Sequence, residues 1–177
     1  MRSSLGMAIK GLVAGGVAVA MATSSYAVVQ GDLGFTSTGS VEISLNVADE
    51  VRINNLADID LGDFDGSDAT GSTPACIFRN SGNAGFELTA NGDGTAGAYQ
   101  LADAANSLPY SVSINTGGAD TDLDANAPAT FTSASNSVDC AVGGNNATIS
   151  VTVDSADAAA LPASAYTGTL TLVVSPN

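Results

Sequence analysis

The sequence predicts an all-β fold, an immunoglobulin-like β-sandwich, because short alternating segments and glycine-rich turns dominate it after residue 27. In residues 41–47 every second side chain is apolar, as in a half-buried strand. Runs such as Asn-Gly-Asp-Gly-Thr at 91–95 supply the turns. Jelly rolls share these features and stay open as an alternative. The strands are expected at residues 41–47, 75–79, 85–90, 108–115, 129–132, 148–153 and 168–174.

Helix is expected only as single turns between strands. Residues 155–160, Ser-Ala-Asp-Ala-Ala-Ala, predict one such turn, and residues 101–106 predict a second. The final segment alternates again and stops at Pro176, so the domain is expected to end in a strand.

Residues 1–27 have the pattern of a secretory signal peptide. Arg2 and Lys10 flank the start of an apolar run over residues 11–22, and Ser25 and Ala27 are the small residues that a cleavage site requires. The run is shorter than the roughly 20 residues of a membrane-spanning helix. A membrane anchor would need a longer run or a lipidated cysteine, and the first cysteine is Cys76. We therefore expect cleavage after Ala27, passage through the periplasm, and a place at the cell surface or outside the cell.

The remaining chain is strongly acidic. Without Arg2 and Lys10 the four basic residues become two, Arg52 and Arg79, against 18 acidic residues, so the net charge is 2 − 18 = −16. Such a surface repels phosphate backbones and anionic lipids, which argues against binding to nucleic acids or membrane surfaces. Membrane insertion is not expected either. We expect a leader with a candidate donor strand at 28–47 and one β-sandwich domain at 48–177.

Composition also argues against an enzyme. The chain has no His and no Trp, so serine or cysteine triads and His-based zinc sites are excluded. A carboxylate pair for glycoside hydrolysis would need a cleft that composition does not indicate. Cys76 and Cys140 are the only cysteines, and in an oxidising compartment we expect them to form one disulfide. Two free thiols are the weaker alternative.

Two groups of acids are weak calcium candidates, and otherwise no metal or cofactor is expected. The spacing Asp-x-Asp-x-Asp resembles the start of an EF-hand loop, but Ala125 stands where that loop needs Gly and Phe131 where it needs Glu. A solvated acidic surface is the favoured interpretation. The candidate ligands are Asp63, Asp65, Asp68, Asp120, Asp122 and Asp124.

The order of several segments resembles a known family. An alternating strand at 41–47 leads into residues 48–56, Leu-Gly-Asp-Phe follows at 61–64, and Cys76 opens a strand. Leu-x-Tyr-x-Val at 108–112, Cys140 and the closing segment 166–176 complete the order. Together these segments are similar to the secreted β-sandwich proteins of the spore-coat-protein-U and chaperone-usher pilin type.

The resemblance implies assembly by donor-strand exchange into an extracellular filament, a fimbria or pilus, with roles in adhesion and biofilm. The partners implied are copies of the chain itself, a periplasmic chaperone and an outer-membrane usher. The donor strand would present Val41, Ile43, Leu45 and Val47 to an acceptor groove in a neighbouring copy. The acceptor-groove strand would contain Leu170, Leu172 and Val174.

Three questions stay open at this stage. Residues 41–47 could instead be the first strand of a self-contained sandwich, in which case the protein would be a free-standing secreted adhesin or surface-binding protein, with or without calcium. The leader before residue 41 holds Val28, Val29, Leu33 and Phe35, so the donor register is not fixed. The sequence does not distinguish a shaft, tip or matrix role.

Overall fold

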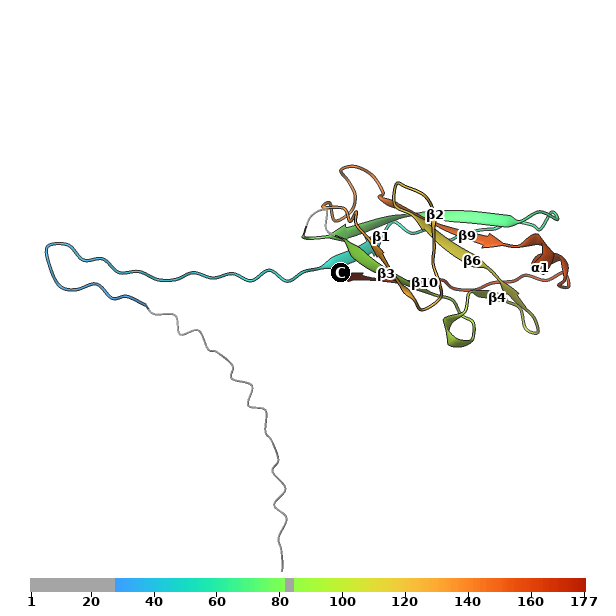
Figure 1. The fold of residues 1–177 in the computed structure, drawn as a ribbon, viewed down its shortest axis with the longest axis horizontal. Coiled ribbons are helices and arrows are strands. Elements are labelled where there is room, and N and C mark those ends of the chain that lie inside the picture. Colours follow the sequence, from blue (N-terminus) through green and yellow to red (C-terminus); the bar gives the residue numbers. More distant parts are fainter. Residues whose placement is uncertain (1–27, 82–84) are drawn as a thin grey trace, which may run out of the picture. The chain divides into compact units, whose positions relative to one another are not determined.

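The structure is a computed structural model that describes residues 28–81 and 85–177. The predicted signal peptide lies outside the described residues. Contacts divide the chain into two units, Met1–Asn46 and Val47–Asn177. The second unit contains two main antiparallel sheets, shown in Figure 1, and the disulfide Cys76–Cys140. This arrangement confirms the predicted all-β sandwich with one disulfide.

The larger sheet has five strands in the order β1-β2-β9-β6-β7. Strand β9 lies at its centre and pairs antiparallel with β2 and β6. Alternate side chains of β9 are buried, as the period of two requires of a strand with one face on the core. The strands are β1 (Val51–Asn54), β2 (Ala69–Arg79), β9 (Ala147–Val153), β6 (Ser111–Asn115) and β7 (Thr121–Asp122).

The smaller sheet has three strands in the order β10-β3-β8. Its central strand β3 (Phe86–Asn91) pairs with β10 (Thr171–Pro176) and with β8 (Pro128–Phe131). A separate hairpin joins β4 (Gln100–Ala102) to β5 (Ser107–Pro109), and the short helices are η1 (Thr95–Gly97) and α1 (Ser155–Ala159).

The core lies between the two main sheets. Its largest fully buried side chains include Ile77 and Ile149 from one sheet and Phe86 and Leu88 from the other. The rings of Phe86 and Phe131 stack with their centroids 5.2 Å apart. Burial of these side chains is the main stabilising term of the unit.

The structure corrects the predicted helical turn at 101–106. Residues up to Ala102 belong to β4, and the turn that follows is held by the Asp103 carboxylate, which accepts hydrogen bonds from the amides of Ala105 (2.8 Å) and Asn106 (2.6 Å). An aspartate that binds the backbone two and three residues ahead favours a turn over a helix. The turn predicted at 155–160 is confirmed as α1, with Asp154 as its N-cap.

Two strand predictions have different bounds in the structure. The segment predicted at 108–115 is divided at Tyr110 between β5 and β6, which pair with different neighbours. The strand predicted at 75–79 begins at Ala69 and contains Pro74. The β1 ladder reaches only as far as Cys76, so Pro74 faces β9 alone and its missing amide interrupts no ladder on the other side.

Within the ranges 28–81 and 85–177, the structure has no helix of the length and apolar character needed to cross a membrane.

Candidate functional site

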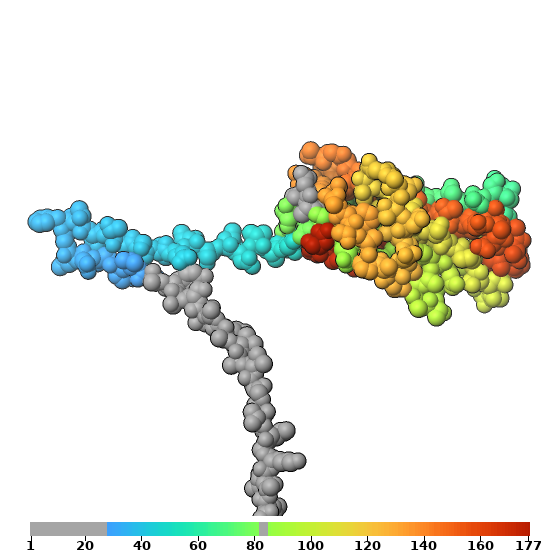
Figure 2. Space-filling model, viewed as in Figure 1, coloured from blue at the N-terminus to red at the C-terminus, as the bar shows by residue number. Residues whose placement is uncertain are grey.

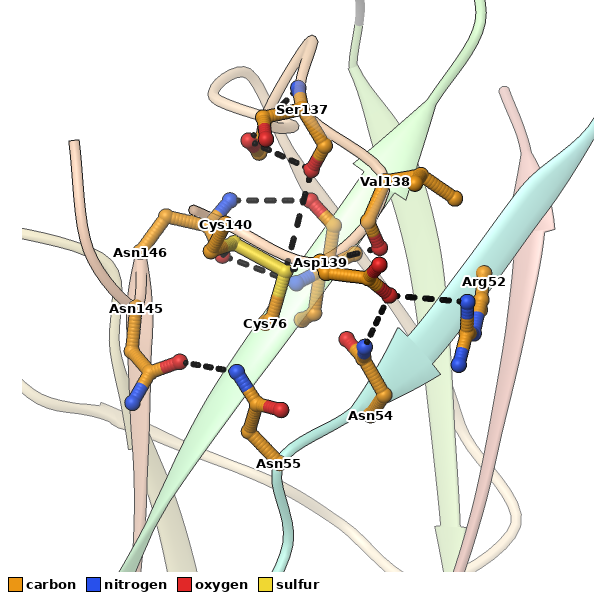
Figure 3. Close-up of a disulfide and its surroundings, with 12 residues drawn as sticks. Arg52, Asn54, Asn55, Cys76, Ser137, Val138, Asp139, Cys140, Asn145 and Asn146 are labelled. Atoms are coloured by element: carbon orange, nitrogen blue, oxygen red, sulfur yellow. Dashed lines mark hydrogen bonds and ion pairs between the residues drawn. A yellow bond between two sulfur atoms is a disulfide. The ribbon is translucent and has the colours of Figure 1, made fainter. Parts of the chain in front are cut away.

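The disulfide fastens the edge of the larger sheet. Asp139, next to Cys140, accepts hydrogen bonds from Arg52 Nη1 (2.9 Å) and Asn54 Nδ2 (3.1 Å), both on β1 (Figure 3). Asn55 Nδ2 donates to Asn145 Oδ1 at 2.8 Å. Asp139, in the loop that the disulfide closes, therefore binds β1 through its side chain, whereas β2 pairs with β1 through the backbone.

After β1 the chain continues beside β2 without a ladder. The amide of Ala57 donates instead to the hydroxyl of Thr73, which is buried, at 2.7 Å. Ile59 and Leu61 then pack half-buried against the core. Residues 56–61 thus form an apolar wall at the edge of the larger sheet.

Strand β10 forms the edge of the smaller sheet. Leu170, Leu172 and Val174 are half-buried and pack on the core, while Val173 is 52% exposed. β10 pairs with β3 along one edge, and no strand of the described residues pairs along its other edge. Its free backbone N–H and C=O groups are a template for another strand.

A groove of about 290 Å³ separates these two edges. Residues 56–61 form one side and residues 168–172 the other, and the floor consists of Thr73, Leu101, Tyr110 and Val151. A second hollow of about 620 Å³ shares Ile59, Leu61 and Gly168 with the first and extends to the residues around α1. The second hollow therefore lies toward α1, which Figures 1 and 2 show at the opposite end of this unit from the end of β10.

The polar group of note at the groove is Tyr110. Its hydroxyl is buried and has no hydrogen-bond partner among the described residues. Burial, together with the charge of Asp93, raises the pKa of Tyr110, and burial raises the pKa of its stacked neighbour Tyr99 to about 12. Tyr110 therefore stays protonated, and its buried hydroxyl donates no hydrogen bond within the described residues.

The four predicted donor residues are exposed and belong to no strand in the structure. Their exposed fractions are 70% for Val41, 89% for Ile43, 88% for Leu45 and 72% for Val47. The strand expected at 41–47 is absent from the described residues because no second strand pairs with this segment, and a strand needs a partner for its backbone groups.

The leader before this segment has one contact of its own. Val29 and Ser40 form an antiparallel bridge, with N–O distances of 3.2 Å and 3.0 Å. Leu33 and Phe35, between them, are fully exposed.

The acidic residues serve local structure. Asp65 accepts from the amide of Ser67, and Asp68 from the amide of Ser155, which lowers the pKa of Asp68. Asp120 accepts from Asn115 Nδ2 at 2.7 Å. Outside residues 1–27 and 82–84, the structure has no group of three or more His, Cys, Asp or Glu side chains placed to hold a metal. The candidate ligands Asp63, Asp65, Asp68, Asp120, Asp122 and Asp124 are therefore not brought together as a site.

Sequence reasoning found one side of the groove and missed the other. Of the three residues predicted for an acceptor groove, Leu170 and Leu172 line this groove and Val174 does not, and their role as acceptors stays a prediction. The wall at 56–61 and the floor residue Tyr110 were not singled out. Ile59-Asp-Leu61 does alternate, but three residues are too few to indicate a strand edge.

Comparison with known proteins supports the fold. No family model matches the chain, and no curated protein sequence matches it. Among solved structures, it is similar to a chain from a chaperone–tip adhesin complex described as vital for synergistic activation of CFA/I fimbriae biogenesis, with a TM-score of 0.50 and 18% identity. The match covers 72% of this chain and 41% of the other, so this chain spans about two fifths of that chain's length. At this identity the likeness concerns the fold.

Proposed function

We propose that this chain is a structural subunit of an extracellular fimbria, which grows when residues 41–47 of one copy insert into the groove of another. One observation carries the proposal: the same chain holds an exposed, strictly alternating apolar segment and an open apolar groove between two sheet edges. The two features are complementary in their apolar character.

The inserted strand would gain two kinds of interaction. Its backbone would pair with the free edge of β10, as in β-strand addition generally, and its alternate side chains would fill the groove. Burial of a Val, Leu or Ile side chain contributes about 1.5 to 3 kcal/mol, so four contribute about 6 to 12 kcal/mol before the entropy cost of ordering the segment.

The geometry favours a filament. Donor segment and groove are different surfaces of one chain, so the contact between copies is heterologous. Heterologous contacts that do not close into a ring propagate as open chains. Each added copy would present a new groove or a new donor segment at the growing end.

The export route is part of the proposal. The signal-peptide pattern of residues 1–27 would bring the chain to the periplasm, where a chaperone would cover the groove until an usher in the outer membrane exchanges it for the next subunit. The structural similarity to a chain of a fimbrial chaperone–adhesin complex supports this route. An exposed groove of this kind would otherwise promote aggregation.

The test is gel mobility in SDS with and without boiling, after co-expression with the neighbouring secretion genes. The unaltered protein should form a ladder that collapses on boiling, and Ile43→Asp with Leu45→Asp should abolish it. Ser44→Asp with Asn46→Asp is the matched control, because it adds the same charge to the opposite face of the segment. Monomers in all three, with folding and secretion verified, would overturn the proposal and favour a free-standing adhesin.

A further inference from the structure

One arginine joins the start of the larger sheet to the end of the smaller one. Arg79 is the only charged side chain among the buried residues of the described chain, at 8% exposure. It donates from Nε to Asp49 Oδ1 (3.0 Å) and from Nη2 to Asp49 Oδ2 (2.6 Å). It also donates from Nη1 to Asn177 Oδ1 (3.0 Å) and to the carbonyl of Gly85. A single guanidinium therefore holds the residues just before β1 against the end of β10.

The two residues after Arg79 extend this contact. Asn80 accepts from the amide of Glu50 (3.0 Å), donates from its own amide to the Glu50 carbonyl (3.1 Å), and donates from Nδ2 to the Ala48 carbonyl (2.6 Å). Ser81 Oγ donates to Asp49 Oδ1 at 2.9 Å. These hydrogen bonds hold residues 48–50 beside residues 79–81, so that the two segments continue the β1–β2 ladder beyond Val51 and Arg79.

The contacts of residues 48–50 with residues 79–81 affect which groove a donor segment can enter. Residues 48–50 connect the donor segment 41–47 to β1, whose continuation forms one wall of the groove. To fill the groove of its own chain, the segment would have to run back beside residues 51–61, with a reversal at 48–50. That reversal requires residues 48–50 to leave residues 79–81. A donor segment from another copy enters the same groove without breaking these bonds.

We propose that Arg79, acting through Asp49, is a positioning residue that keeps the donor segment out of the groove of its own chain and so directs exchange to other copies. This inference rests on the proposed function, since it concerns the occupant of the same groove. Arg79 also lowers the pKa of Asp49, so the pair stays ionised at neutral pH. We call the contacts of residues 48–50 with residues 79–81 the clamp. The clamp would thus operate at neutral pH, where subunits would assemble.

The experiment measures whether the groove of an isolated monomer is free. The mature chain is refolded at high dilution, the monomer is isolated, and capture of a fluorescent synthetic peptide of residues 39–48 is measured. Asp49→Ala weakens the clamp, because it removes the bonds from Arg79 and Ser81. Asp139→Ala is the matched control because it removes the other ion pair, Arg52–Asp139, without touching residues 48–50. Each is made alone and together with Ile43→Asp and Leu45→Asp, which disable the chain's own segment.

The expected result is weaker peptide capture by the Asp49→Ala variant and recovery of capture when its own segment is disabled. Asp49→Ala should capture the peptide about tenfold more weakly, as for a groove that is open in about a tenth of the molecules. The added Ile43→Asp and Leu45→Asp should restore capture, because the chain's own segment no longer competes. Asp139→Ala should bind as the unaltered protein does.

Three other results would overturn the inference, and they are distinct. Undiminished capture by Asp49→Ala would show that the clamp does not control the groove. Diminished capture that Ile43→Asp and Leu45→Asp do not restore would mean that the substitution damages the groove itself. If the chain with an intact clamp and the disabled segment captures no peptide, the groove accepts no strand, and the proposed function fails together with the clamp.

Discussion

Residues 41–47 and residues 170–174 both have an apolar side chain at every second position, but only the second set packs against the domain. Leu170, Leu172 and Val174 are half-buried on the core, and β10 pairs with β3. Ile43 and Leu45 are about nine-tenths exposed and pair with nothing in the described structure. Two segments of equal pattern therefore have different environments.

The difference shows what an alternating pattern specifies. A period of two indicates that one face of a strand is buried. It does not indicate which molecule supplies the surface that covers this face. For residues 170–174 the surface is the domain's own core. For residues 41–47 we propose that the surface is the groove of another copy. The predictions below separate the two segments experimentally.

Removal of the disulfide should have the largest effect, and only on the domain. Cys76→Ser with Cys140→Ser opens a loop with a sequence separation of 64, for which chain entropy gives a loss of about 4 kcal/mol in the free energy of unfolding. Guanidinium unfolding of the monomer measures it. The NMR signals of residues 41–47 should stay where they are in the unaltered monomer; if they move, the segment depends on the fold of the domain as β10 does.

A pair of matched truncations compares the segments directly. Leu172→Ala should lower the free energy of unfolding of the monomer by about 2 kcal/mol, because a half-buried leucine loses its contacts with the core. Leu45→Ala should change it by less than about 0.5 kcal/mol, as an exposed side chain does. Urea unfolding at a concentration that keeps the protein monomeric makes the measurement. Equal losses for the two variants would mean that residue 45 packs on its own domain.

Acid should weaken the β10 side of the groove through Asp103. Two backbone hydrogen bonds, from Ala105 and Asn106, lower the pKa of this carboxyl from 3.8 to about 2. Because the pKa is lower in the folded state, the stabilisation is complete above about pH 4 and disappears as the pH falls toward 2. This turn follows Ala102, which bridges to Thr167 just before β10.

The measurement is the free energy of unfolding between pH 5 and pH 2. Asp103→Asn should flatten the decline over this range, since its side chain does not ionise. Asp32→Asn, which removes the same charge from the leader, is the control and should leave the slope as it is. A parallel decline for Asp103→Asn and the unaltered protein would show that these hydrogen bonds do not stabilise the fold.

Much of the fold follows from local pattern. β3, β8, β9 and β10 lie close to the predicted bounds because each has alternating or β-branched residues next to recognisable turns. The disulfide was predicted from two cysteines and an expected oxidising compartment, and the structure contains it. β1, β4 and β7 were missed, because two to four residues carry too little periodicity and these strands form only where a neighbour is already in place.

The site was predictable on one side only. The donor segment and β10 are visible as patterns, whereas the groove depends on topology that brings residues 56–61 opposite residues 168–172. The clamp could not be predicted from the sequence for a related reason. Arg79 looked like one of two ordinary basic residues, and its role depends on Asp49 and Asn177, which lie far from it in the sequence.

A small effect is also predicted for the ion pair of Arg52, and it sharpens the contrast with Arg79. Arg52 and Asp139 form an ion pair with exposed side-chain fractions of 52% and 59%, and such pairs contribute about 0.5 kcal/mol. Asp139→Ala should therefore lower the free energy of unfolding by no more than about 1 kcal/mol, with the hydrogen bond to Asn54 included, and 0.5 M salt should shrink the difference. Chemical unfolding at low and high salt measures this. Arg79 differs from Arg52 because its guanidinium is buried and joins two chain segments. If Asp139→Ala lowers the free energy of unfolding by much more than about 1 kcal/mol, β1 depends on the disulfide loop more than on its ladder with β2.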